Sequence, residues 1–359
     1  MDSFIDVNAP PNPGLIVMFG SGETAPSSQK VYDWLFSKLT YPVRVAVLET
    51  PAGFQLNTAT VAEKIGDFLR LHLQNYHPEV SMVAARKKDT LFSPDNEEIV
   101  RPILTSNVML MGPGSPTYAY RNLNDTLAWN TMVAKHRQSA ALVLASAAVI
   151  AVGRYLLPIY EIYKAGEDLH WRDGLDLLGA YGLPLVFISH LNNREGGDEF
   201  DTRYCYMGQE RFDKLYAMLP SEVNIVGIDE HTALIIDLND EKCMVMGNGT
   251  VALIRQGRET RYRDGEQFSI SELGSYNKIE PRIGIPDDVW ENVSAAFEDE
   301  RDKMNLSPPV EIVTLVHERE KARTSGDWEV SDLLRQQIQK KGWQVNDTKD
   351  GPALNKLDQ

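Results

Sequence analysis

The stretch ALVLASAAVIAVG, residues 141 to 153, joins a strand-like apolar run to a run of small helix-forming residues. One hydroxyl, that of Ser146, interrupts it where the two patterns meet. A serine at a sharp turn between a buried strand and a helix can expose its oxygen, and the first N–H groups of the helix can then face an oxyanion. The stretch therefore predicts a strand followed by a helix, with Ser146 as a candidate nucleophile.

The same alternation of short apolar runs and longer amphipathic stretches extends over the first two hundred residues. Expected strands cover 15–19, 43–49, 80–84, 108–111, 141–145 and 185–189, and expected helices cover 29–38, 60–74 and 126–137. This order is typical of βα units that build a parallel sheet. Such sheets carry their ligands at the carboxyl ends of the strands, so the loops that follow the strands hold the candidate site residues.

The pattern changes after Asn224, where closely spaced strands and a GNG turn at 247–249 predict an antiparallel edge. Residues 272–309 are charged and contain prolines, so we expect a connector with one short helix near 289–302. Two helical patterns follow, separated by TSGD, in which Asp327 is the expected N-cap. The predicted organisation is an α/β domain over 1–271, a connector over 272–309 and a small helical module over 310–359.

The composition excludes several function classes. Of 359 residues, 43% are hydrophobic and 24% are charged, which is ordinary for a globular protein. The formal net charge of −15 repels nucleic-acid phosphates at long range. Cys205 and Cys243 lack metal-ligand spacing, so we expect no zinc and no other cofactor. The N-terminus has no basic and apolar leader, and no apolar run could cross a bilayer, so we expect a cytoplasmic protein without a membrane partner.

A candidate base lies at the same expected sheet edge as Ser146. The run LPLVFISH ends a predicted strand at His190, and general-base catalysis needs an imidazole close to the hydroxyl. An acid that orients the imidazole is sought in the acidic segment between the two residues, where Glu161 is the first choice. The alternatives are Glu167, Asp168 and Asp173 as acids and His170 as a rival base.

The residues two positions before and two positions after Ser146 argue against its role as a nucleophile. In a sharp nucleophile turn these positions are normally glycine or another very small residue, but here they are Leu144 and Ala148. A leucine could crowd the backbone. The competing hypothesis is therefore a noncatalytic binding protein that keeps the scaffold, buries Ser146 away from His190, and uses its C-terminal module to bind tRNA or a protein partner.

Several motifs together resemble one protein family. They are the turn around Ser146, GLDLLG at 174–179, YMGQERFDKLYAML at 206–219 and VGIDEHTALII at 226–236. In this order they resemble the cyanophycinase and dipeptidase E family of serine peptidases, over residues 14–255. The resemblance implies a class I glutamine amidotransferase-like fold, which is a three-layer α/β sandwich with a mostly parallel sheet.

The resemblance also implies a mechanism and a substrate class. It implies a serine hydrolase that cleaves a small peptide or amide through an acyl-enzyme, with a preference for acidic residues. The implied roles are nucleophile for Ser146, base for His190, acid near Glu161, and oxyanion N–H donors from Gly114, Ser115 and Ala147. Arg203 and Arg211 are candidates for binding a substrate carboxylate. The family often reads Asp-Gln-His at the base, where this chain has Ile188 and Ser189 before His190.

The C-terminal residues 312–351 have a different resemblance. They are similar to the C-terminal module of cysteinyl-tRNA synthetases, although the chain has no HIGH-like or KMSKS-like motif. The matching residues are Arg319, Ala322, Arg323, Trp328, Asp332, Arg335, Gly342, Val345, Asp347, Thr348, Asp350 and Gly351. A tRNA contact would be sought at Lys340, Lys341 and Trp343. Acidic and basic residues balance in this tail, so the alternative is a helical hairpin for packing or for oligomer contacts, and we also consider a homodimer.

Overall fold

The computed structural model describes residues 12–39, 42–306, 310–348 and 351–357. The chain divides into two compact units between Ser294 and Ala295, and each is described by itself. Most of the N-terminal segment examined for a leader, as well as Asp350 of the tail resemblance, lies outside the described residues. Among the described residues, no helix has the length and apolar character needed to span a membrane.

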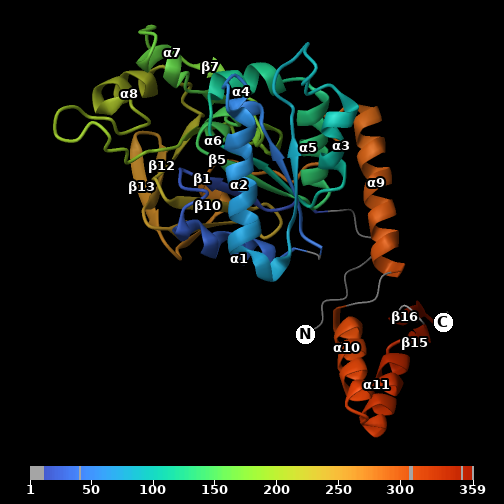
Figure 1. The fold of residues 1–359 in the computed structure, drawn as a ribbon. Helices are drawn as coiled ribbons and strands as arrows, with labels where there is room; N and C mark the ends of the chain where they lie inside the picture. The colour runs from blue at the N-terminus through green and yellow to red at the C-terminus, as the bar shows by residue number, and fades with distance from the viewer. Residues whose placement is uncertain (1–11, 40–41, 307–309, 349–350, 358–359) are drawn as a thin grey trace. The chain divides into compact units, whose positions relative to one another are not determined.

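The first unit is built on an eight-stranded sheet (Figure 1). Five neighbouring strands are parallel, in the order β1, β5, β4, β2 and β3, and three antiparallel strands, β10, β11 and β14, extend the sheet beyond β1. The bounds are β1 Ile16–Phe19, β2 Arg44–Leu48, β3 Glu79–Val83, β4 Val108–Met111, β5 Ala141–Ala145, β10 Thr232–Asp237, β11 Lys242–Gly247 and β14 Gln267–Ser269. The mostly parallel sheet with an antiparallel extension is thus confirmed.

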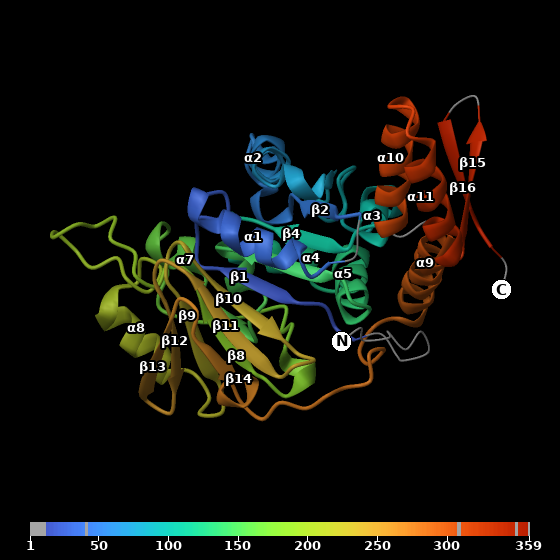
Figure 2. The ribbon, with the colours of Figure 1, turned by 90° about the horizontal axis from the view of Figure 1, so that it is seen from below.

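Helices cover both faces of this sheet, because its inner strands are apolar on both sides. In β1, Ile16 and Met18 join one apolar cluster, whereas Val17 and Phe19 join another. The second cluster is closed by α1 (Gln29–Phe36) and α2 (Thr58–His72), which lie together on one side of the sheet (Figure 2). The helices that contribute to the first cluster are α3 (Glu97–Leu104), α4 (Pro116–Leu123), α5 (Leu127–Arg137) and α6 (Ala147–Ala151).

A second, four-stranded sheet corrects one expectation. Its order is β13, β12, β9 and β8, with bounds Arg258–Arg263, Thr250–Arg255, Asn224–Ile228 and Leu185–Ile188. The strand expected at 185–189 therefore pairs with β9 and not with the main sheet. The GNG turn connects β11 to β12, which belong to different sheets, so it closes no hairpin. Strand character is local, but the choice of hydrogen-bonding partner is not, which is why the sequence pattern missed the second sheet.

The remaining elements of the first unit lie around this second sheet. They are β6 (Tyr155–Leu156), α7 (Ile159–Tyr163), β7 (Arg172–Asp173) and α8 (Gly208–Ala217). Apolar residues of α7 and α8 share one cluster with β8, β9 and β12. Short 3₁₀ turns occur at Pro26–Ser28, Thr50–Ala52, Gln74–Tyr76, Gly179–Tyr181 and Ile270–Glu272.

The C-terminal unit is more than a helical hairpin. The expected short helix of the connector is the longer α9 (Asp287–Leu306), and α10 (Val310–Thr324) and α11 (Trp328–Lys340) follow. A hydrogen bond from the Val330 N–H to Asp327 Oδ1, 3.1 Å long, confirms Asp327 as the N-cap of α11. An antiparallel strand pair, β15 (Trp343–Thr348) and β16 (Gly351–Lys356), follows α11, and the prediction of a purely helical module omitted it.

Two residues of this unit bear on the expected RNA contact. Trp343 is only 5% exposed and belongs to the small core with Ile338 and Val345, so it offers no stacking surface. Alternation along β15 turns Trp343 and Val345 to the same, inner side. Trp328, at the start of α11, is instead 61% exposed, and the guanidinium of Arg323 lies 5.7 Å from its ring centre.

Candidate active site

Ser146 occupies a strained turn between β5 and α6. Its φ of 54° and ψ of −112° lie in a region that residues with a side chain rarely adopt. The turn is held because the Ser146 N–H donates to the carbonyl oxygen of Phe19 on the neighbouring strand, at 3.0 Å. Such strain costs about 1–3 kcal/mol and persists only where the surroundings impose it. The Ser146 hydroxyl therefore projects from a turn that is hydrogen-bonded to the end of the sheet.

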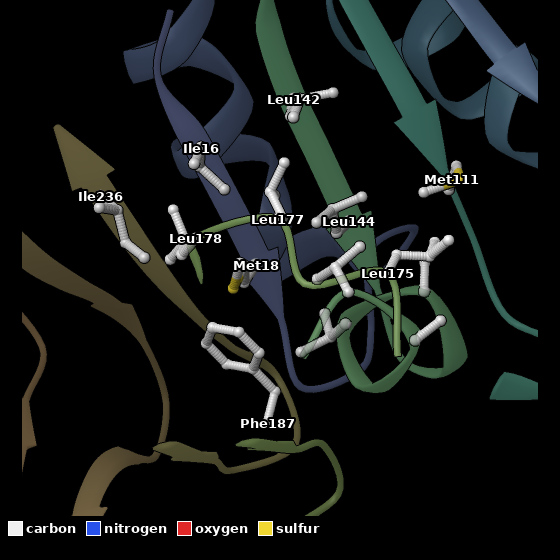
Figure 3. Packing of buried hydrophobic residues seen from close by; sticks show 14 of the residues in the cluster. Ile16, Met18, Met111, Leu142, Leu144, Leu175, Leu177, Leu178, Phe187 and Ile236 are labelled. Atoms are coloured by element: carbon white, nitrogen blue, oxygen red, sulfur yellow. The ribbon is translucent and has the colours of Figure 1, made fainter. Parts of the chain in front are cut away.

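Leu144 does not prevent this turn. Its side chain is fully buried in the core cluster on one face of β5, and its strand neighbours in register are Met18 and Met111. Figure 3 shows it surrounded by apolar side chains, among them Leu175. Ala148, in the first turn of α6, is also fully buried. The leucine therefore fills core volume beneath the turn, and the crowding expected from its size does not occur.

His190 meets the hydroxyl from the second sheet. It follows β8, has a φ of 50°, and its N–H donates to the Gly20 carbonyl oxygen at 3.2 Å. Its Nε2 lies 2.8 Å from Ser146 Oγ, within the range expected for a nucleophile and its base. The competing hypothesis required Ser146 to be buried away from His190, and the described geometry is the opposite.

The carboxylate that contacts His190 is Glu230, not Glu161. Oε1 of Glu230 lies 2.8 Å from His190 Nδ1 and accepts a second hydrogen bond from Asn193 Nδ2 at 3.1 Å. The Glu230 N–H donates to Asn192 Oδ1 at 2.8 Å, which ties the loop after β9 to the loop after β8. The hydrogen bond with His190 is the largest cause of the lowered pKa of Glu230, so the carboxyl is ionised at neutral pH.

The sequence contained a pattern that could have identified Glu230 as the acid. Glu230 follows β9 within VGIDEHTALII, one of the motifs that carry the family resemblance, and lies at a strand end as His190 does. The predicted acid was Glu161 on α7, because an acid was expected in the segment between Ser146 and His190. One carboxylate oxygen of Glu161 is buried without a hydrogen-bond partner among the described residues. Chain order does not restrict which residues meet in space.

The alternative acids and the rival base form a separate, partly exposed group. Glu167 Oε2 lies 3.6 Å from His170 Nε2 and from Arg172. Nδ1 of His170 lies 2.8 Å from the carbonyl oxygen of Asp168. Asp173 is exposed on β7. None of these residues has a contact with Ser146 or His190 in the described part of the chain.

Two backbone N–H groups lie beside the hydroxyl. Gly114 and Ala147 line the same cavity as Ser146, and among the described residues their N–H groups donate no hydrogen bond. Ser115 was the third expected donor, but its N–H already donates to the Pro51 carbonyl oxygen at 2.9 Å. Its Oγ caps α4. Gly114 and Ala147 are therefore the donors available to an oxyanion near Ser146.

The cavity at Ser146 has a volume of about 400 Å³. It is lined by Gly114, Pro116, Ser146, Ala147, Ile150, Ile159, Tyr160, Tyr163, Lys164, His190, Glu195, Cys205 and Tyr206. Neither Arg203 nor Arg211 belongs to this lining. Nε and Nη2 of Arg203 donate to the two carboxylate oxygens of Asp201, at 2.9 and 2.8 Å. Arg211 is exposed on α8. The two arginines expected to bind a substrate carboxylate therefore do not line the cavity at Ser146.

Comparison with solved structures identifies the fold. The chain is similar to a peptidase from an acI-B1 Actinobacterium, with a TM-score of 0.57 and 19% sequence identity, over 72% of this chain and 97% of that chain. This likeness supports a mixed α/β fold with a large, mostly parallel sheet flanked by helices. No family model matches the chain.

Comparison with curated proteins concerns only a C-terminal segment. It is 47% identical over 51 residues to the cysteine–tRNA ligase of Methanosarcina mazei, and 46% identical over 52 residues to that of Chlamydia abortus. Each match covers 14% of this chain and 11% of the ligase. The chain thus spans about a tenth of the length of these curated relatives.

Proposed function

We propose that the chain is a serine hydrolase that cleaves a small peptide or amide bond with Ser146, His190 and Glu230. The proposal rests on one observation, the unbroken series of contacts from Ser146 Oγ to His190 Nε2 and from His190 Nδ1 to Glu230, each at 2.8 Å. A hydroxyl, an imidazole and a carboxylate in this order are the parts that nucleophilic acyl transfer requires.

The reaction follows from this geometry. Ser146 Oγ attacks the substrate carbonyl carbon while its proton passes to His190 Nε2, and the N–H groups of Gly114 and Ala147 face the oxyanion that forms. The C–N bond then breaks as His190 returns the proton to the leaving amine. A water molecule, deprotonated by His190, attacks the resulting ester and releases the carboxylic acid, which restores the Ser146 hydroxyl. Glu230 stabilises the imidazolium in both halves of the reaction.

Labelling with a serine-reactive phosphonate tests the proposal. The full chain should incorporate one phosphonate at Ser146, as measured by mass spectrometry of the intact protein and its peptides. The variant Ser146→Ala should incorporate none, and Ser115→Ala, a serine in the neighbouring loop whose hydroxyl caps a helix, should retain labelling. Equal labelling of the chain and of Ser146→Ala would refute the assignment.

A second function is favoured by the cysteine–tRNA ligase segment. We propose that the C-terminal unit contacts tRNA, through the exposed ring of Trp328 together with Arg323 and Lys340. An exposed aromatic ring beside a guanidinium can stack on an unpaired base, and a lysine adds attraction to phosphate. Since the whole chain is acidic, we expect weak affinity that falls steeply with salt.

Filter binding of the full chain to total tRNA at low salt tests this contact. Trp328→Ala and Lys340→Glu should each weaken binding about three- to tenfold. Leu333→Ala, an exposed apolar residue of the same helix, is the matched control and should leave binding unchanged. Absence of tRNA binding, or equal binding by all variants, would contradict the proposal without affecting the hydrolase assignment.

A further inference from the structure

Much of the cavity wall is aromatic and aliphatic. Ile150 and Ile159 line it together with Tyr160, Tyr163 and Tyr206. The rings of Tyr163 and Tyr206 have centres 5.1 Å apart and planes inclined at 36°, so they form one extended apolar surface. A wall of this kind favours a flat apolar group over a charged side chain, because a charge would lose its hydration against it.

One cation lies at the edge of this wall. Lys164 is exposed, and its Nζ lies 4.9 Å from the ring centre of Tyr163. In the described part of the chain it is the only lysine or arginine in the lining. Among the described residues it has no ion pair. An ammonium group held against a ring, but without a counter-ion, is available to an anion that enters the cavity.

The acidic residue of the lining is already engaged. Burial raises the pKa of Tyr206, and a hydrogen bond between Tyr206 and Glu195 raises it further. The Glu195 N–H also donates to Asn193 Oδ1 at 3.1 Å. The carboxylate of Glu195 is therefore hydrogen-bonded to Tyr206, and among the described residues Lys164 is the one cation that lines the cavity.

The size of the cavity limits what can enter. About 400 Å³ lies toward the small end of ligand sites, which suits a dipeptide or a comparably small amide. Within this volume a ligand must reach Ser146, contact the tyrosines and approach Lys164.

We propose that this cavity binds a short peptide that carries an aromatic side chain beside the bond to be cut and a carboxylate that pairs with Lys164. The inference rests on the proposed hydrolase function and names its substrate class. It departs from the family resemblance, which implies a preference for acidic residues, because the lining holds three tyrosines and one lysine and includes neither Arg203 nor Arg211.

Binding, measured apart from turnover, tests the proposal. The probes are N-acetyl-L-phenylalanine, its neutral amide and N-acetyl-L-aspartate, titrated calorimetrically into the full-length Ser146→Ala chain, which cannot consume them by the proposed route. We expect N-acetyl-L-phenylalanine to bind about tenfold more tightly than either of the other two, since it alone has both the ring and a carboxylate placed for Lys164.

Two further substitutions in the same background separate the contributions. Lys164→Met should reduce the affinity for N-acetyl-L-phenylalanine to that of the amide. Tyr163→Ala should weaken both phenylalanine probes about three- to tenfold. The matched control is Lys38→Met, because Lys38 is exposed and also lies over an aromatic ring, 5.9 Å from the centre of Trp34, but does not line the cavity.

The outcomes distinguish this inference from the proposed function. Tighter binding of N-acetyl-L-aspartate, no binding of any probe, or a carboxylate preference that survives Lys164→Met would overturn the substrate class. Phosphonate labelling of Ser146 would stand in each of those cases. Failure of labelling, with the expected binding pattern intact, would instead remove the hydrolase assignment and leave a binding site for the same ligands.

Discussion

At the scale of single residues, Glu230 and Glu161 are two carboxylates that differ in whether they contact His190. Glu230 touches the imidazole and has a lowered pKa because of that hydrogen bond, whereas Glu161 lies on α7 and makes no contact with His190. An ionised carboxylate at Nδ1 holds the imidazole in the tautomer that accepts the serine proton and stabilises the imidazolium that results. The two residues should therefore respond differently to the same substitution.

We expect Glu230→Gln to slow phosphonate labelling of Ser146 at least about 100-fold at pH 7.5, because the amide has no charge to stabilise the imidazolium. Glu161→Gln, which makes the same chemical change, should leave the labelling rate within about twofold. Mass spectrometry of samples quenched at successive times measures the labelling rates of both variants. A comparable loss in the two variants would show that the contact with His190 has no special role.

At the scale of elements, the loop between β4 and α4 controls where one oxyanion donor lies. A Cβ built on Gly114 would come within 1.8 Å of the Pro51 carbonyl oxygen, and the φ of Gly114 is 154°. The next N–H, that of Ser115, donates to the same oxygen, which holds the loop against the Thr50–Ala52 turn. No side chain fits between the two loops, so only glycine permits this approach.

Gly114→Ala should displace the loop and its N–H donor. We expect the labelling rate of Ser146 to fall about 10- to 1000-fold, as for loss of an oxyanion donor, and the melting temperature to fall as well. Gly265→Ala is the control, because Gly265 also has a positive φ, of 80°, but has no atom within 4 Å of an added Cβ. That variant should lose stability, by about 1 kcal/mol, and keep the labelling rate. Unimpaired labelling of Gly114→Ala would exclude this loop from the site.

At the scale of the whole molecule, one buried histidine makes stability depend on pH. His136, on α5, is 1% exposed, and burial lowers its pKa from 6.5 to about 4. At a pH between these two pKa values, His136 is protonated in the unfolded chain and neutral in the folded chain. The free energy of unfolding therefore decreases as the pH falls from 6.5 toward 4, by up to about 3 kcal/mol from this residue.

Urea unfolding at pH 7 and at pH 4.5 measures this dependence. His136→Gln should be less sensitive to acid than the unaltered chain by about 2–3 kcal/mol, because glutamine has no proton to gain. The difference between the two proteins isolates His136 from the carboxyl groups, which titrate in both. Equal acid sensitivity would mean that folding does not lower the pKa of His136.

The parts that could be predicted from the sequence are those that local pattern controls. Apolar runs located β4 and β5 at their observed bounds and the other parallel strands within one or two residues, because burial on both faces leaves a continuous apolar signal. Ser146 and His190 were found because each ends such a run. Asp327 was found as an N-cap because the capping hydrogen bond is made within one turn of its own helix.

The rest depended on contacts between distant parts of the chain. Packing and hydrogen-bond partners far away in sequence decide three features. They pair β8 with β9 and not with the main sheet, they bring Glu230 to His190, and they place Trp343 in the core of its unit. Sequence alone determined the parallel strands of the main sheet, the helices expected over 29–38, 60–74 and 126–137, the turn at Ser146 and the candidate base, since these follow from the order of neighbouring residues. Tertiary structure decided the acid, the free oxyanion donors and the aromatic wall of the cavity, because only folding brings their separate loops to one place.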